Sequence, residues 1–223
     1  MNIAIIPARK GSTRIKEKNI ILFKKKPMIY WTINAAKKSK LFDKIYVDTD
    51  CNKIKKIAVS YGAEVPFLRY KKYANNKISV NLSTYYFLLR LKKFENLKVK
   101  NVFQLMANCP FRNNQDIIRF YKSFLKKKCK SMISHVEPKF FNPWWSVKVK
   151  KDKIYRLNDF AYKKRSQDLP ELLCPTGAIW ISDYETFLKN KTFYSQSYSY
   201  DILSWKNGID IDTYEELVIS KNL

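Results

Sequence analysis

Histidine is almost absent from this sequence, since His135 is the only one among 223 residues. Mechanisms that require two histidines are therefore excluded, and this one, in M-I-S-H-V, is interpreted as a strand-end residue rather than a catalytic base. Closely spaced cysteine pairs are absent too. Cysteines stand at positions 51, 109, 129 and 174, without the CxxC spacing of zinc and redox sites, so we expect four reduced thiols.

Long apolar runs are also lacking. No stretch approaches the roughly 20 apolar residues that cross a membrane as a helix. The run Ile3–Ile6 is too short for the hydrophobic region of a signal peptide, and Arg9 follows shortly after it. We therefore expect a cytoplasmic protein without a membrane partner.

Acidic residues are scarce, because 19 Asp and Glu stand against 44 Lys and Arg and give a net charge of +25. Such a charge can indicate a polyanionic partner such as a nucleic acid. Only eight of the 44 cations are arginine, however, and nucleic-acid surfaces use arginine for bidentate contacts with phosphates and bases. The excess of lysine, beside abundant Asn, Ile and Tyr, favours an A+T-rich coding bias with no nucleic-acid partner. The residual positive field would favour an anionic substrate.

Apolar residues are plentiful enough for a core, at 46% hydrophobic and 15% aromatic. At this length we expect one compact domain with a small appended element. Short apolar strands alternate with longer amphipathic stretches, which is typical of an α/β fold with a mostly parallel sheet. Strands are predicted near residues 2–7, 44–48, 100–106, 131–136 and 178–182, and helices near 27–40, 52–61, 80–93, 114–127 and 213–221.

This alternation breaks over residues 137–173, where P-K-F-F-N-P-W-W-S-V-K-V is followed by a charged turn. The segment has neither a helical period nor the pattern of a strand–helix–strand unit. Phe140, Phe141, Trp144 and Trp145 give it more aromatic surface than one small domain is expected to cover. We predict that residues 137–173 form an inserted hairpin arm within a single 1–223 domain, and that this arm packs on a second subunit.

The strongest feature for chemistry is the loop A-R-K-G-S-T-R-I-K-E-K-N-I that follows the first predicted strand. Loops at the carboxyl edge of such a sheet are where ligands bind. Gly11 lets the backbone approach a phosphate, and Ser12 adds a hydroxyl donor. The cations are Arg9, Arg14, Lys16 and Lys18. The loop matches neither G-x-x-x-x-G-K-[ST] nor G-x-G-x-x-G, so both of those fingerprints are excluded. From the residues alone, a solvated basic loop stays an alternative.

An acidic pair forms the second feature, in N-G-I-D-I-D-T near the C-terminus. If this segment is a strand, Asp210 and Asp212 point to one face. Paired carboxylates suit Mg²⁺, which keeps several waters and takes substrate phosphates as its other ligands. An edge strand with a polar face is the structural alternative. Asp48 and Asp50, in V-D-T-D, have the same spacing and the same ambiguity.

Together these motifs resemble a known family. I-P-A-R-K-G-S-T-R-I-K-E-K-N-I is similar to the N-terminal signature of the acylneuraminate cytidylyltransferases, the CMP-sialic acid synthetases and their relatives for bacterial nonulosonates. The similarity continues in order through P-M-I-Y-W-T-I-N-A-A, V-D-T-D, Y-G-A-E-V-P-F-L-R, L-M-A-N-C-P-F-R, P-T-G-A-I-W-I and I-D-I-D-T, over nearly the whole chain. Six further ordered matches are far more specific than the basic loop or either acidic pair alone.

The resemblance implies a Rossmann-like three-layer α/β sandwich of the nucleotide-diphospho-sugar transferase type, with a small dimerisation arm. It also implies the reaction: the anomeric hydroxyl of a nonulosonic acid attacks the α-phosphate of CTP, which yields a CMP-sugar and pyrophosphate. Such chemistry depends mainly on positioning and on charge stabilisation. Mg²⁺ is the implied cofactor. A homodimer is the implied assembly, in which the arm helps to close the partner's sugar site.

Site residues carry over by motif. Catalytic roles fall to Arg9, Lys18 and Asp210. Nucleotide binding falls to Arg9, Gly11, Ser12, Arg14, Lys18, Asn19, Arg69 and Ser79. Sugar binding falls to Gln104, Asn108 and Thr176. Mg²⁺ would be held by Asp210 and Asp212.

Several positions depart from the usual family pattern. Thr13 replaces the common Lys of G-S-K, with Arg14 as its substitute. Met106 stands where the sialic acid enzymes have a sugar-contacting Gln, for which Gln104 on the same strand face is a replacement, and Cys174 stands where they have an Arg. These losses argue against plain N-acetylneuraminate. The F-L-R, N-C-P-x-R and N-P-W-W segments resemble the branch that acts on diaminated nonulosonates of the pseudaminic or legionaminic type.

Two other functions are alternatives. A GT-A-like glycosyltransferase could use the same basic loop and acidic pair, and it would consume a nucleotide sugar without releasing pyrophosphate. A basic nucleic-acid-binding protein would show sequence-tolerant affinity with a steep dependence on salt.

Overall fold

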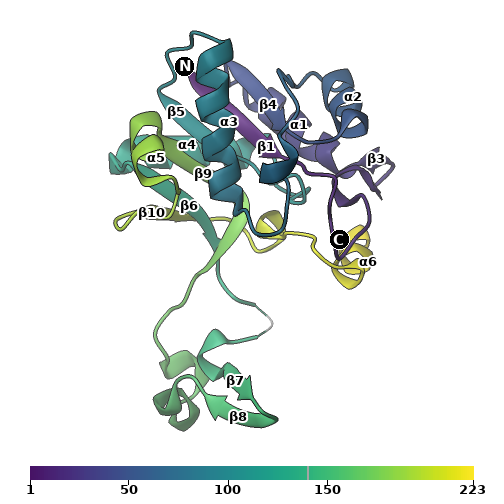
Figure 1. Cartoon of the computed structure of the whole chain (residues 1–223). Coiled ribbons are helices and arrows are strands. Elements are labelled where there is room, and N and C mark those ends of the chain that lie inside the picture. The colour runs from purple at the N-terminus through teal and green to yellow at the C-terminus, as the bar shows by residue number, and fades with distance from the viewer. Residues whose placement is uncertain (140) are drawn as a thin grey trace.

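The structure is a computed structural model that describes residues 1–139 and 141–223. Its centre is a six-stranded sheet in the order β10-β6-β9-β5-β1-β4 (Figure 1). The strands are β1 (Asn2–Pro7), β4 (Lys44–Asp48), β5 (Asn101–Gln104), β6 (Ser131–Val136), β9 (Cys174–Asp183) and β10 (Ser199–Ile202). β1 pairs in parallel with β4 and β5, and β10 with β6, whereas β9 runs antiparallel between β5 and β6. The predicted mostly parallel sheet is confirmed.

Helices cover both faces of this sheet. They are α1 (Met28–Ser39), α2 (Asn52–Ser60), α3 (Val80–Phe94), α4 (Asn114–Lys127), α5 (Tyr184–Asn190) and α6 (Tyr214–Lys221). Side chains alternate along β1, so Ala4 and Ile6 pack with α1, α2 and α4, while Ile3 and Ile5 pack with α3 and α5. The predicted three-layer sandwich is therefore confirmed. None of the helices in the described ranges has both the length and the apolarity needed to cross a membrane.

Some elements differ from the sequence prediction. Strand β5 ends at Gln104 rather than at residue 106, and β9 is longer than the predicted 178–182. β10 and α5 were not predicted because both are short, and β10 reads only S-Y-D-I. A two-stranded ribbon of β2 (Leu22–Phe23) and β3 (Lys26–Pro27) also escapes the pattern.

The I-D-I-D segment is not a strand, so the strand reading of residues 209–212 is wrong. Its backbone donates from Ile211 N to Asn108 O at 2.9 Å and from Ile209 N to Lys206 O at 3.3 Å, which is not the repeated bonding of a strand ladder. The alternation nevertheless survives in the burial pattern, because Ile211 is fully buried while Asp210 and Asp212 are partly exposed. The segment leads directly into α6.

The arm leaves the sheet from β6 and returns to it at β9, and it projects away from the body of the molecule (Figure 1). It contains a hairpin of β7 (Val147–Lys150) and β8 (Lys153–Arg156) and three short 3₁₀ helices, η3 (Pro143–Trp145), η4 (Asp159–Lys163) and η5 (Ser166–Asp168). Internal hydrogen bonds hold it together, since Trp145 Nε1 donates to Ala161 O at 3.2 Å and Tyr162 OH to Trp145 O at 2.7 Å. Phe141 is 88% exposed. Phe140, which was predicted to share this surface, lies outside the described residues.

Candidate active site

A cleft of about 300 Å³ opens beyond the carboxyl end of β1. Its walls come from the basic loop at residues 9–19, the segment 69–83, the segment after β5, and Asp212. Predicted site residues on this cleft are Arg9, Ser12, Arg14, Lys18, Asn19, Arg69, Asn108 and Asp212. Segments distant in the sequence therefore meet here, at the edge of the sheet where α/β folds bind their ligands.

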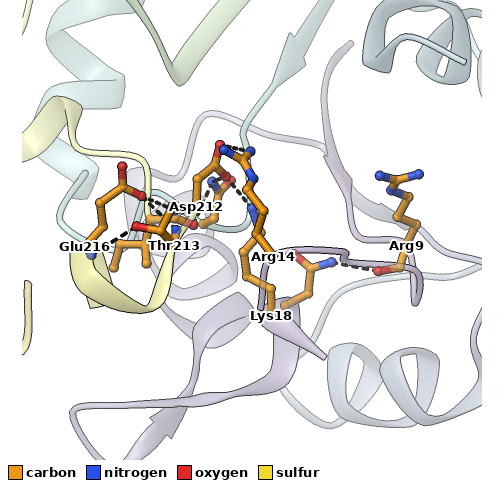
Figure 2. A network of polar contacts seen from close by, with 9 residues as sticks. Arg9, Arg14, Lys18, Asp212, Thr213 and Glu216 are labelled. Carbon is orange, nitrogen blue, oxygen red and sulfur yellow. Dashed lines mark hydrogen bonds and ion pairs between the residues drawn. The ribbon is translucent and has the colours of Figure 1, made fainter. Parts of the chain in front are cut away.

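The basic loop is fixed by hydrogen bonds on several sides. Ala8 N donates to Asp48 O at 2.9 Å, and Lys10 N donates to the Asp50 carboxylate at 2.8 Å. Asn19 Nδ2 donates to the carbonyl of Arg9 at 2.9 Å. Figure 2 shows the Arg9 side chain apart from the cluster in which Arg14 and Lys18 form ion pairs with Asp212. The loop therefore presents cations at two separate places along the cleft.

Asp212 forms ion pairs with the second group of cations, Lys18 and Arg14. Lys18 Nζ lies 2.5 Å from Asp212 Oδ1, Asn108 Nδ2 donates to the same oxygen at 3.0 Å, and Arg14 Nη2 pairs with Oδ2 (Figure 2). Burial by itself raises the pKa of Asp212. The hydrogen bond and charge of Lys18, together with the charge of Arg14, outweigh that effect and leave the pKa below its usual value. Asp212 is therefore an anion held between two cations.

Helix α6 sets the position of Asp212. Thr213 is its N-cap and accepts from Glu216 N at 3.2 Å, while the Glu216 carboxylate accepts from Thr213 N at 2.8 Å. The same carboxylate accepts from Asp212 N at 2.6 Å. This capping box fixes the backbone of Asp212.

Asp210 is more deeply placed and does not line the cleft itself. Burial and the neighbouring charge of Asp212 raise the pKa of Asp210 to about 6, against the charge of Lys18 and a hydrogen bond from the Gly177 backbone. Gly177 is required by this close approach, because a Cβ there would lie 2.9 Å from Asp210 Oδ2 and 2.8 Å from Met106 Cγ. A cation near this pair would relieve the repulsion between the two carboxylates.

The other acidic pair is occupied by structural contacts. Asp48 forms an ion pair with Arg69 Nη2 at 2.6 Å and accepts from Ser83 Oγ at 2.9 Å. Burial raises the pKa of Asp48, and the charge of Arg69 opposes that rise. Asp50 accepts from the Lys10 backbone as described above. This pair therefore orders Arg69 and the basic loop, an assignment that sequence spacing left open.

Two predicted sugar contacts are turned into the core. Gln104 has no exposed surface and accepts from Thr84 Oγ1 at 2.6 Å. Thr176 shares a 2.8 Å hydrogen bond with Ser134 and is buried. Asn108 lies on the cleft, and so does Met106. The structure thus brings Asn108 to the site and leaves Gln104 and Thr176 behind its wall.

Two predicted nucleotide contacts lie outside the cleft lining. Ser79 is exposed and caps α3 by accepting from Leu82 N at 3.2 Å. Gly11 is exposed as well, and a Cβ at this position would meet nothing within 4 Å. Lining residues that the motifs did not indicate include Asn75, Ile78, Val80 and Ser83. Asn75 and Ile78 belong to the stretch A-N-N-K-I-S at residues 74–79, and Val80 and Ser83 follow it.

Arg112 is a further residue that sequence reasoning did not assign. It is fully buried and donates from Nη1 to Ala178 O at 2.8 Å and to Met106 O at 3.4 Å. Burial lowers the pKa of its guanidinium to about 10. Arg112 therefore ties the segment after β5 to strand β9 and fixes the backbone of Met106.

The fold and the cleft are those of a nucleotidyltransferase. A solved structure entitled CMP:2-keto-3-deoxy-manno-octonic acid synthetase complexed with CTP superimposes with a TM-score of 0.70, covers 100% of this chain and 99% of its own, and is 14% identical, which shows the shared fold. A family model described as Cytidylyltransferase matches residues 3–138. The chain belongs to this cytidylyltransferase family.

Two curated relatives are similar over 95% of their length, and a third over about half of its length. A pseudaminic acid cytidylyltransferase of Campylobacter jejuni (strain 81-176) is 30% identical, with 100% of this chain and 95% of the relative covered. A CMP-N,N'-diacetyllegionaminic acid synthase of Legionella pneumophila is 33% identical, with 99% and 95% covered. An N-acylneuraminate cytidylyltransferase of Streptococcus agalactiae is 30% identical over 97% of this chain and 51% of the relative.

Proposed function

We propose that this protein transfers CMP from CTP to the anomeric hydroxyl of a nonulosonic acid and releases pyrophosphate. The observation that carries the proposal is the cleft in which the cations of the basic loop face the carboxylate of Asp212. Cations stabilise the negative charge of a bound polyphosphate. In a phosphoryl transfer they act together with a metal ion, whose anionic ligands must therefore lie close to them. The named functions of the full-length relatives support the same reaction.

In this reaction the acceptor oxygen forms a bond to the α-phosphorus of CTP, and the bond from that phosphorus to the bridging oxygen breaks. The acceptor hydroxyl loses its proton, and pyrophosphate leaves with the electron pair. Arg9, Ser12, Lys18 and Asn19 would hold the triphosphate, while Arg69 would lie near the nucleotide. The lysine and arginine charges would stabilise the negative charge that develops on the leaving pyrophosphate.

Mg²⁺ fits the acidic pair. Burial and, after it, the charge of Asp212 raise the pKa of Asp210, and a bound cation would offset both effects. Within the described part of the chain, no group of three or more His, Cys, Asp or Glu side chains forms a metal cage. Asp210 and Asp212 would therefore supply the protein ligands and leave room for water and phosphate oxygens. Bound Mg²⁺ would neutralise phosphate charge and orient the triphosphate.

The acceptor is proposed to be a diaminated nonulosonate of the pseudaminic or legionaminic type. Met106, on the cleft, and Cys174, half-buried at the start of β9, are weak hydrogen-bonding groups that suit acylated rather than hydroxylated sugar faces. Relatives of both names span the whole chain. N-acetylneuraminate is expected to be a poor acceptor, with a modest preference because an apolar contact discriminates weakly.

The proposed assembly is a homodimer in which the arm crosses to the partner and helps to close its sugar site. Its exposed apolar side chains support this proposal, since Phe141, Val149 and Ile154 are each more than 60% exposed. Light scattering at micromolar concentration should give twice the 26.6 kDa chain mass. A monomer would refute the dimer.

The reaction is tested by pyrophosphate release. CTP, ATP, GTP and UTP are compared with pseudaminate, legionaminate, N-acetylneuraminate and 3-deoxy-manno-octulosonate as acceptors, with and without Mg²⁺. We expect turnover that is specific for CTP and requires the metal, with the highest kcat/KM for a diaminated nonulosonate. No CTP-dependent turnover with any acceptor would overturn the function, and a clear preference for N-acetylneuraminate would overturn the acceptor assignment.

A further inference from the structure

A second cavity, of about 710 Å³, lies between the segment 67–73 and helix α3. It shares Arg69 and Ser83 with the nucleotide cleft, and the described residues that line it include neither the basic loop nor Asp212. Its volume falls in the range of small-molecule sites, roughly 300–1,000 Å³. Arg69 and Ser83 form the wall on the side of the cleft. The cavity is therefore a separate space that touches the candidate active site through a shared wall.

Aromatic rings dominate the lining. They are Phe67, Tyr70, Tyr73, Tyr86, Phe87 and Phe94. Tyr73 and Tyr86 are stacked at 3.9 Å, and the Phe67 ring lies 5.1 Å from Phe87. Tyr70 and Phe94 are both more than half exposed, at 53% and 60%. The cavity thus offers ring faces that solvent reaches, and planar ligands stack on such faces.

Positive charge accompanies these rings. The Arg90 guanidinium lies 4.2 Å from the Phe67 ring centroid and 4.1 Å from that of Tyr70, and its Nη1 donates to Leu68 O at 2.6 Å. The buried Nε atoms of Arg90 and Arg69 have no hydrogen-bond partner among the described residues. Two donors at this cavity are therefore unused.

Charges at the edge of the cavity have the same sign. Lys92 and Lys93 are exposed on α3 and belong to its lining. The carboxylate in the lining is that of Asp48, which is 2% exposed and already paired with Arg69 at 2.6 Å. Among the cations in this lining, Arg69 is neutralised by Asp48. A ligand in the cavity would therefore contact other cations that no acid of the lining neutralises.

We propose that this cavity is a second small-molecule site, which binds a planar aromatic anion. The ring system would stack on the exposed Tyr70 and Phe94 faces, and the acidic group would lie near Arg90, Lys92 and Lys93. Arg69 belongs to both this cavity and the nucleotide cleft, so occupancy here changes the affinity for CTP. Binding of CTP changes the affinity for the second ligand by the same factor.

The probe for this site is 8-anilinonaphthalene-1-sulfonate, titrated by fluorescence into the full-length protein with saturating CTP and no acceptor. We expect a saturable component that persists with CTP and whose affinity differs at least twofold from that without CTP. The neutral analogue N-phenyl-1-naphthylamine has the same rings without the sulfonate and should bind at least fivefold more weakly. One-for-one displacement of the probe by CTP, an affinity that CTP leaves unchanged, or equal binding of the neutral analogue would overturn the proposal.

Variants locate the bound probe. The Lys92→Glu/Lys93→Glu double variant reverses the edge charge and should weaken the saturable component at least tenfold. Leu89→Trp alters another lining residue that is 39% exposed, and it should weaken binding through bulk while every charge is kept. The control Lys122→Glu/Lys126→Glu makes the same charge change at exposed positions of α4 and should alter binding less than twofold.

Pyrophosphate release from CTP, measured without the probe, confirms that each variant is folded, because none of these residues lies on the catalytic cleft. If the control weakens binding as much as the double variant, the probe senses general charge, and the site is rejected. If Leu89→Trp and the double variant both bind normally, the probe lies elsewhere, which also rejects the site.

Discussion

Two acidic pairs in this chain have the same spacing and different surroundings. Asp48 and Asp50 stand at the end of β4, where Asp48 is 2% exposed and pairs with a buried arginine. Asp210 and Asp212 precede α6, and the Asp212 side chain is 31% exposed and pairs with cations of the basic loop. The spacing in the sequence therefore places two carboxylates close together. Whether their charge has a structural or a functional role depends on partner residues from other parts of the chain.

The partners of the two pairs differ in how easily they can be exchanged. Arg69 is enclosed, with a 7% exposed side chain, so its pairing with Asp48 belongs to the folded core. Arg14 is 61% exposed, and exposed ion pairs contribute little to stability. Incoming phosphates can therefore take Arg14 from Asp212 at small cost, whereas they cannot take Arg69 from Asp48.

The largest effect is expected from Asp48→Ala. This change leaves the Arg69 charge buried without its partner, which costs about 3–5 kcal/mol of unfolding free energy. Urea denaturation measures the loss. The control Ser83→Ala removes one hydrogen bond to the same carboxylate and should cost about 1 kcal/mol. A loss of less than 1 kcal/mol for Asp48→Ala would show that this pair is no more structural than the other.

The next effect concerns activity. Asp212→Asn removes the negative charge of a proposed Mg²⁺ ligand at almost constant volume, and we expect kcat/KM to fall about a hundredfold to a thousandfold, as on loss of a major electrostatic contact. Unfolding free energy should fall by only about 1 kcal/mol, because Asp212 is 31% exposed and Asn keeps an oxygen that can accept from Lys18 and Asn108. The matched control is Asp50→Asn, which keeps an oxygen for Lys10 N and should lower kcat/KM less than about threefold. Similar falls for both variants would remove the functional distinction between the pairs.

The smallest effect is the pH dependence from Asp210. The pKa of Asp210 is about 6, so its carboxyl is protonated below that pH and cannot hold a cation. We expect kcat/KM to fall by up to about tenfold for each pH unit below 6. Asp210→Asn should have a low rate without this inflection. A flat profile of the unaltered enzyme between pH 5 and 7 would contradict the role of Asp210.

Stability should respond to pH in the opposite direction at this residue. The folded-state pKa of Asp210 lies above the ordinary value of 3.8, so the folded protein binds this proton more tightly than the unfolded chain. The contribution of Asp210 to the unfolding free energy therefore increases as pH falls from about 6 towards 4. Comparing urea midpoints of the protein and Asp210→Asn over this range isolates the contribution.

The sheet and its order of elements were largely readable from the sequence. Apolar runs such as Ile3–Ile6 are too short for a helix and therefore favour buried strands, and the helix at 27–40 has a clear period. β10 was not readable, because its four residues have no distinctive apolar pattern and their pairing with β6 is a tertiary effect.

The motifs predicted most of the residues of the site, but they did not predict the contacts between these residues. Lys18 and Asp212 are 194 residues apart, and their pairing follows from the fold rather than from spacing. Gln104 was predicted to replace the Gln missing at Met106 because it lies on the same strand face, yet Thr84 holds its side chain in the core. Ser83 reaches Asp48 across 35 residues, so no local pattern shows that this acid is already paired.

The attachment of the arm has a consequence for the register of the sheet. Val136, the last residue of β6, and Cys174, the first of β9, are directly paired in the sheet, so the chain departs and returns at one point. Removal of the intervening segment would leave two adjacent antiparallel strands, which a short turn can connect. The pairing of β6 with β9 therefore does not depend on the length of the arm, so a shorter or longer arm would leave the register of these strands unchanged.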